Sequence, residues 1–167
     1  ELEQYVTLSK ENVEREGTVI LKINLPEKLE SGFHVINVEG SEVAKNKEGI
    51  AASASITVPI KIFVPYDGKY IEATFEVPDV NVNKEGKVMI HVRNIGTKSI
   101  KELYAKVSIL NNENERKKIE TAKTILLPEE TRTLKTTFTT HDLEQGTYKA
   151  VAHIYFDEQQ ETLEREF

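Results

Sequence analysis

Apolar and polar residues alternate along most of the chain. The alternation is most regular over residues 18–25, 70–77, 87–93, 103–109 and 148–156. A period of two is that of a β-strand with one buried and one solvated face. Such half-buried strands are typical of antiparallel sheets. The pattern therefore predicts an all-β protein built from antiparallel sheets.

Turn residues separate the alternating segments. Asp67-Gly68 is a hairpin-type dipeptide, and further loops are expected at 84–86, 94–96 and 111–115. Short strands at this spacing predict a β-sandwich. Residues 113–126 allow two interpretations, a short helix or a turn followed by a strand from about Lys117. The Thr- and Ile-rich second half favours the strand.

A short motif occurs twice in the chain. Residues 29–34 and 143–148 share the pattern Leu-Glu-x-Gly-x-aromatic ring, and each copy precedes an alternating strand. Two copies of one supersecondary unit predict two domains, 1–65 and 66–167. The first copy has only 13 residues before its Glu-rich turn, whereas the second has about 60. We therefore expect 1–65 to be the C-terminal portion of a sandwich and 66–167 to be a whole one. The short, Pro-containing joint at 64–68 predicts stiff coupling between them.

These motifs resemble those of a known family. Residues 25–35 (LPEKLESGFHV) are similar to a segment of Ig-like domains in secreted or envelope-anchored archaeal and bacterial proteins. Residues 88–96 (VMIHVRNIG), 127–131 and 143–148 resemble a CARDB-type domain, an Ig-like module named for a role in cell adhesion. The resemblance implies tandem Ig-like sandwiches and an extracellular or cell-envelope location, with no shared catalytic residues. The chain departs from the family pattern at Glu130, where Gly is usual, and at His34, where Tyr is usual.

Tyr148 is the best-defined position of the repeated motif. A Tyr at the start of a late strand can donate a hydrogen bond from its hydroxyl back to the preceding loop, as in a tyrosine corner. We assign this fold-holding role to Tyr148 together with Leu143 and Gly146, and to Gly32 and His34 in the first copy.

Composition narrows the classes of function. The chain has 167 residues and a formal net charge of −6, which argues against nucleic-acid binding. It has no cysteine, so disulfides and thiolate metal sites are excluded. Its richness in Lys and Glu resembles that of thermophile proteins. No apolar run approaches the ~18 residues of a membrane helix. Since the chain starts at Glu1, we expect any signal or anchor to lie outside it.

No motif for catalysis or cofactor binding is present. The four histidines have no metal-ligand spacing, and the HExxH, GxSxG and phosphate-loop patterns are absent. We therefore expect no enzyme activity, no cofactor and no metal. His91 and His153 lie on polar strand phases, which favours solvated side chains, although they could neighbour each other across a sheet. The acidic tail at 157–166 could attract Ca²⁺ but lacks a calcium-loop pattern.

The sequence thus favours a non-enzymatic extracellular or envelope module, acting as a scaffold, spacer or adhesive arm with a protein or cell-surface partner. An incomplete first domain would leave an open sheet edge and an uncovered face of Val19, Leu21, Ile23 and Leu25, which predicts self-association or packing on 66–167. The alternative is an accessory carbohydrate-binding domain with Tyr66, Tyr70, Tyr104 and Tyr155 as its platform, although the lack of Trp weakens it. An assembly chaperone is less favoured, because no basic anchor for a subunit terminus is evident.

Overall fold

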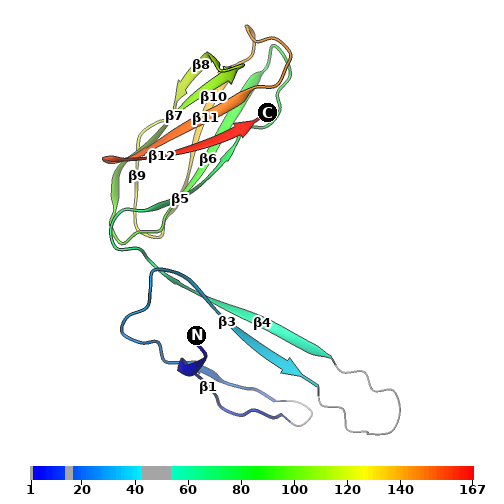
Figure 1. Cartoon of the computed structure of the whole chain (residues 1–167), viewed down its shortest axis with the longest axis vertical. Coiled ribbons are helices and arrows are strands. Elements are labelled where there is room, and N and C mark those ends of the chain that lie inside the picture. Colours follow the sequence, from blue (N-terminus) through cyan, green and yellow to red (C-terminus); the bar gives the residue numbers. More distant parts are fainter. Residues whose placement is uncertain (1, 14–16, 43–53) are drawn as a thin grey trace. The chain divides into compact units, whose positions relative to one another are not determined.

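The computed structural model describes residues 2–13, 17–42 and 54–167. The chain divides into two compact units, Glu1–Pro65 and Tyr66–Phe167 (Figure 1). The first contains a short 3-10 helix, η1 (Glu3–Tyr5), and strands β1 (Val6–Leu8), β2 (Leu21–Ile23), β3 (Gly32–Ser41) and β4 (Ser55–Val64). The second contains β5 (Ile71–Glu76), β6 (Glu85–Asn94), β7 (Ile100–Asn111), β8 (Asn114–Glu120), β9 (Thr124–Leu126), β10 (Thr131–Thr139), β11 (Lys149–Phe156) and β12 (Gln159–Glu166). The predicted all-β class is confirmed.

The second unit is a sandwich of two sheets. One sheet has the strand order β10-β6-β5, and the other has the order β12-β11-β7-β8 with β9 also paired to β7. Every strand pair is antiparallel. The chain leaves the first sheet after β6, returns to it for β10 and then leaves again. Pairing of β10 with β6 and of β11 with β7 is the Ig-like arrangement, so the predicted fold class is confirmed for this unit.

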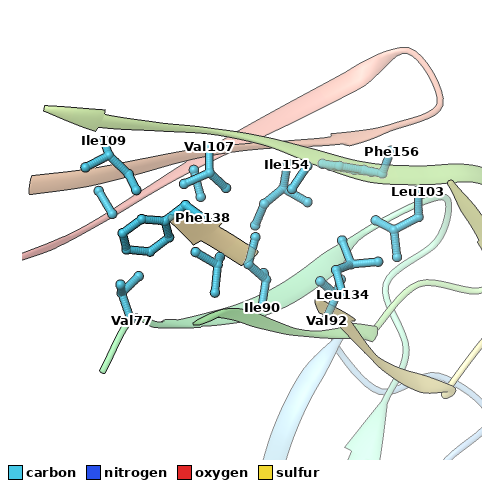
Figure 2. Packing of buried hydrophobic residues seen from close by; sticks show 14 of the residues in the cluster. Val77, Ile90, Val92, Leu103, Val107, Ile109, Leu134, Phe138, Ile154 and Phe156 are labelled. Atoms are coloured by element: carbon cyan, nitrogen blue, oxygen red, sulfur yellow. The ribbon is translucent and has the colours of Figure 1, made fainter. Parts of the chain in front are cut away.

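Aliphatic side chains from both sheets fill the space between them. Ile154 and Leu103 of one sheet point towards Ile90, Val92 and Leu134 of the other (Figure 2). Ile90, Val92, Leu103 and Ile154 are fully buried. Since full burial of one such side chain stabilises by about 1.5–3 kcal/mol, this layer is the main source of the unit's stability.

The described residues of the first unit form two separate two-stranded sheets, β1-β2 and β3-β4. The strand predicted over 18–25 is shorter than expected, because β1 offers a partner to only three of its residues. Val19 and Leu25 lie outside it and are 40% and 46% exposed. β3 and β4, by contrast, pair over ten residues each.

Residues 113–126 are extended, as the sequence favoured. A turn with positive φ at Asn112 and Glu113 leads directly into β8, which begins at Asn114, three residues before the predicted start. β8 and β9 both pair with β7, so this segment widens the second sheet and does not form a helix.

The turn after β6 is held by the buried side chain of Asn94. Its Oδ1 accepts a hydrogen bond from the Gly96 N–H at 2.9 Å, and its Nδ2 donates to the carbonyl of Lys98 at 2.9 Å. Nδ2 also reaches the carbonyl of Leu126 in β9 at 3.3 Å, which belongs to the other sheet. The Asn-x-Gly pattern is therefore a cap for the turn and a polar link between the sheets.

Glu130, at which the sequence departs from the motif it resembles, has a local role. Its carboxylate accepts a hydrogen bond from the Leu127 N–H at 2.9 Å and one from Arg132 Nε at 2.8 Å. The hydrogen bond from the Leu127 main chain is the largest influence on the Glu130 carboxyl and lowers its pKa. The side-chain hydrogen bond from Arg132 lowers the pKa further. The positive φ that the turn requires falls on the preceding residue, Glu129. Glycine is therefore not needed at position 130.

A second polar link joins the sheets through Asp157, in the turn between β11 and β12. Its Oδ1 accepts hydrogen bonds from the N–H groups of Lys101 and Glu102 at 2.9 and 2.8 Å. Its Oδ2 is shielded from solvent, and the ammonium of Lys69 lies 2.5 Å away. Burial alone would raise the pKa of the Asp157 carboxyl, but Lys69 and the two main-chain donors outweigh it and lower the pKa below its usual range.

We predict that Asp157→Asn lowers the free energy of unfolding by about 1–2 kcal/mol at pH 7. The loss is small for a shielded carboxylate, because its partner Lys69 is partly solvated. The folded-state pKa lies below the unfolded value of about 3.9, so the carboxylate stabilises above that value and the stabilisation is lost as the pH falls through the folded pKa. Urea unfolding at several pH values measures the difference between the two proteins. A difference that stays constant from pH 7 to pH 2 would contradict the prediction.

Candidate functional site

The second copy of the repeated motif ends in a hydrogen bond from a side chain to the main chain. The hydroxyl of Tyr148 donates to the carbonyl of Glu144, four residues earlier, at 2.9 Å. The Tyr148 ring is 8% exposed and belongs to the hydrophobic core, as does Leu143. This is the geometry of a tyrosine corner at the start of β11.

The first copy contains the equivalent bond with a different donor. Nε2 of His34 donates to the carbonyl of Glu30, also four residues earlier, at 2.7 Å. His34 and Tyr148 hold the same place in the two copies of the motif. The imidazole therefore makes the corner contact that the phenol makes in the second copy.

The glycines of the two copies differ. Gly32 has a φ of 124°, in the region that disfavours a side chain. Gly146 is not among the positive-φ residues, and a Cβ placed there would meet only Asn111 Nδ2, at 3.9 Å. The structure thus gives a conformational reason for glycine at position 32 and none at position 146.

We expect Tyr148→Phe to lower the free energy of unfolding by about 1–3 kcal/mol, because the carbonyl of Glu144 loses its donor in a part-buried setting. Thermal melting followed by circular dichroism measures the loss. Tyr70→Phe is the matched control, since its ring is 49% exposed and its melting midpoint should stay near that of the parent. An unchanged midpoint for Tyr148→Phe would show that the corner bond contributes nothing.

A cavity of about 430 Å³ lies beside this corner, in the size range of ligand sites. The loop after β5, the loop before β11 and Phe167 form its walls. The hydroxyl of Thr140, which is 4% exposed, lies 2.9–3.0 Å from the carbonyls of Asn81 and Lys84 and holds the two loops together. Phe167 is fixed by two main-chain bonds with Tyr148, both 3.0 Å. The walls are therefore anchored to the sandwich on each side.

The four tyrosines considered as the platform of the alternative function form two separate pairs. Tyr66 and Tyr70 contact each other with ring centroids 5.3 Å apart, and Tyr104 and Tyr155 stack at 5.0 Å with 14° between their planes. Nζ of Lys106 lies 5.8 and 5.4 Å from the Tyr104 and Tyr155 centroids, and Nζ of Lys123 lies 4.8 Å from the Tyr104 centroid. The second pair is thus an aromatic and cationic patch on the outer face of the larger sheet.

His91 and His153 are not neighbours. His91 lies in β6 of the three-stranded sheet, and His153 lies in β11 of the other sheet. Each ring bonds a threonine on the adjacent strand, Thr133 at 2.9 Å and Thr162 at 3.0 Å. The alternative of a contact across one sheet is thus not realised, because a period of two shows which phase of a strand is polar but not which sheet the strand joins.

In the acidic tail, two carboxylates are engaged in ion pairs, that of Asp157 with Lys69 and that of Glu164 with Lys149, each at 2.5 Å. Within the described ranges, no group of three or more His, Asp or Glu side chains is placed to hold a metal ion. Over the same ranges, no helix combines the length and the apolar character needed to cross a bilayer.

No model of a protein family and no curated protein matches the chain. Among solved structures, the chain is similar to the CARDB domain of the PF1109 protein from Pyrococcus furiosus. The crystal structure of that domain with di-metal ions has 22% identity and a TM-score of 0.46, covering 62% of this chain and 89% of that one. The solution structure of the same domain has 24% identity and a TM-score of 0.41, and the match covers 55% of this chain and 77% of that one. A β-glucosidase from Listeria innocua in complex with gluconolactone has 18% identity and a TM-score of 0.37, and the match covers 59% of this chain and 16% of that one.

Proposed function

We propose that the chain is a non-enzymatic module of the cell envelope or extracellular space, which acts as a scaffold or adhesive arm. The observation that carries this proposal is the β3-β4 sheet of the first unit. In the part of the chain that the structure describes, β3 and β4 pair only with each other. A two-stranded sheet has two outer edges, and an unpaired edge is a template for a strand from another molecule.

One face of this sheet is apolar from Ile36 to the far end of the hairpin, beyond the pair of His34 with Ile62. Directly paired residues of antiparallel strands share a face, and the pairs Ile36–Ile60 and Val38–Val58 are followed by Ile56. Ile36 is buried, whereas Val58 and Ile56 are 52% and 68% exposed. The apolar face therefore becomes exposed towards the end of the hairpin, where a partner would gain most by covering it.

The second unit supports a spacer role for a different reason. Its core is closed, and polar links at Asn94 and Asp157 fasten its two sheets to each other. A sandwich of this kind keeps its shape while it carries an interacting element. The proposed location outside the cell rests on the resemblance of the sequence motifs to Ig-like modules of secreted proteins.

The test is the oligomeric state of the whole chain. We expect the mass measured by light scattering to rise with concentration in the micromolar range, because a second copy covers the exposed face and edge. Ile56→Lys/Val58→Lys should abolish the rise, since two charges on that face cannot be buried cheaply. The matched control, Asn37→Lys/Thr57→Lys, adds the same charge to the opposite face and should still associate. A strict monomer at all concentrations would overturn self-association as the mode of contact.

A second candidate, carbohydrate binding, is supported by the Tyr104–Tyr155 stack on the sheet surface. The two lysines over these rings occupy part of the surface that a sugar would stack on. Affinity electrophoresis with soluble polysaccharides tests it. Retardation that is lost in Tyr104→Ala/Tyr155→Ala would favour this function over the first.

A further inference from the structure

Both acidic and apolar residues line the cavity beside the Tyr148 corner. Two acidic residues on different loops, Asp79 and Glu144, are among its lining residues, and both are exposed to solvent. Apolar residues, Val80, Val82, Tyr148 and Phe167, line it as well. No lysine or arginine lines it. Among the ion pairs formed by the described residues, none uses Asp79 or Glu144.

We propose that this cavity binds the side chain of a lysine or arginine presented by a partner protein. Such a side chain has an apolar stem and a cationic head. The valines and the Phe167 ring would cover the stem, and the two carboxylates would pair with the head. The faces of the aromatic rings attract the same charge. The inference does not depend on the open sheet of the first unit, which lies in a different part of the chain.

The lining disfavours other classes of ligand. An anion would meet two carboxylates and no basic group. A hard metal ion such as Ca²⁺ takes six to eight oxygen ligands, and no cluster of three acidic or histidine side chains suited to a metal exists among the described residues. A wholly apolar ligand would leave both acidic residues without a partner of opposite charge.

Two contacts fix the cavity in advance of binding. The Tyr148 hydroxyl holds the main chain at Glu144, and Thr140 holds the main chain at Asn81, between Val80 and Val82. A site whose walls are already ordered loses less conformational entropy when a ligand enters. Glu144 is therefore positioned by the same corner that stabilises the fold.

The experiment is a titration of the ¹⁵N-labelled chain with N-acetyl-lysine methylamide, followed by amide chemical shifts. N-acetyl-norleucine methylamide is the uncharged probe of similar shape. We expect saturable shifts for the lysine probe at residues 80–82, 143–146 and 167, and none for the norleucine probe. Asp79→Asn/Glu144→Gln should weaken binding about tenfold, the effect of losing about 1.4 kcal/mol of charge pairing.

The control variant, Glu72→Gln/Glu158→Gln, removes the same charge from sites that do not line the cavity and should bind as the parent does. Thermal melting of both variants verifies that they are folded. The proposal is overturned if the norleucine probe binds as well as lysine, if the shifts fall elsewhere, or if the Asp79/Glu144 variant binds unchanged. It is also overturned if only calcium chloride, added as a separate arm, shifts these residues.

Discussion

Asn94→Ala is expected to lower the free energy of unfolding of the second unit by about 3–4 kcal/mol, enough to remove much of the stability of a small domain. The side chain is fully buried and makes three hydrogen bonds to main-chain groups. Alanine removes all three and leaves the Gly96 N–H without its acceptor. The bond to Leu126 also crosses between the sheets, so its loss weakens their attachment.

Urea unfolding followed by far-UV circular dichroism measures this effect. Asn114→Ala is the matched control, because Asn114 is exposed and its side chain makes one local bond, to the carbonyl of Asn112. We expect the control to change the free energy of unfolding by no more than about 0.5 kcal/mol. Equal effects of the two substitutions would refute the role given to Asn94.

Gly96→Ala is expected to destabilise the same unit by about 2–4 kcal/mol for a steric reason. A Cβ at this position would lie 2.3 Å from the Gly68 carbonyl oxygen and 2.8 Å from the Tyr70 nitrogen. Both are main-chain atoms in a segment bonded to the turn itself, through Tyr70 to Ile95 and through Gly68 to Lys98. The segment cannot move aside without breaking those bonds.

The matched control for this substitution is Gly146→Ala, since an added methyl group would meet only one atom, at 3.9 Å. Thermal melting of the two variants provides the comparison. We expect a marked fall in the midpoint for Gly96→Ala and little change for Gly146→Ala. Equal midpoints would show that the turn relaxes around the methyl group.

The sequence predicted the strands well where period-two alternation and turn residues agreed. Residues 70–77, 87–93, 103–109 and 148–156 all contain strands of the sandwich. The prediction over 18–25 was too long, because the length of a strand depends on its partner, and β1 has only three residues. Strand pairing is a tertiary property that a local pattern does not contain.

The candidate sites were predictable to a smaller extent. The hydrogen bond of Tyr148 lies within one local motif, and its geometry follows from that motif. The cavity could not be predicted, because Asp79 and Glu144, which both line it, are 65 positions apart and belong to loops with no distinctive sequence. The ion pair of Asp157 with Lys69 could not be predicted from the sequence either, because it depends on how the two sheets lie on each other.

The aliphatic layer of the sandwich contains no directional bond between the sheets. Packing between core residues such as Ile90 and Ile154 depends on buried area and shape and not on the angle of a bond. Polar contacts add directional constraints on how the sheets lie: Asn94 with Leu126 and Lys69 with Asp157 at one end, and Lys117 with Asp142 elsewhere. During evolution, the aliphatic core residues can be replaced by residues of similar volume. The residues that make the polar contacts between the sheets have the least freedom to change.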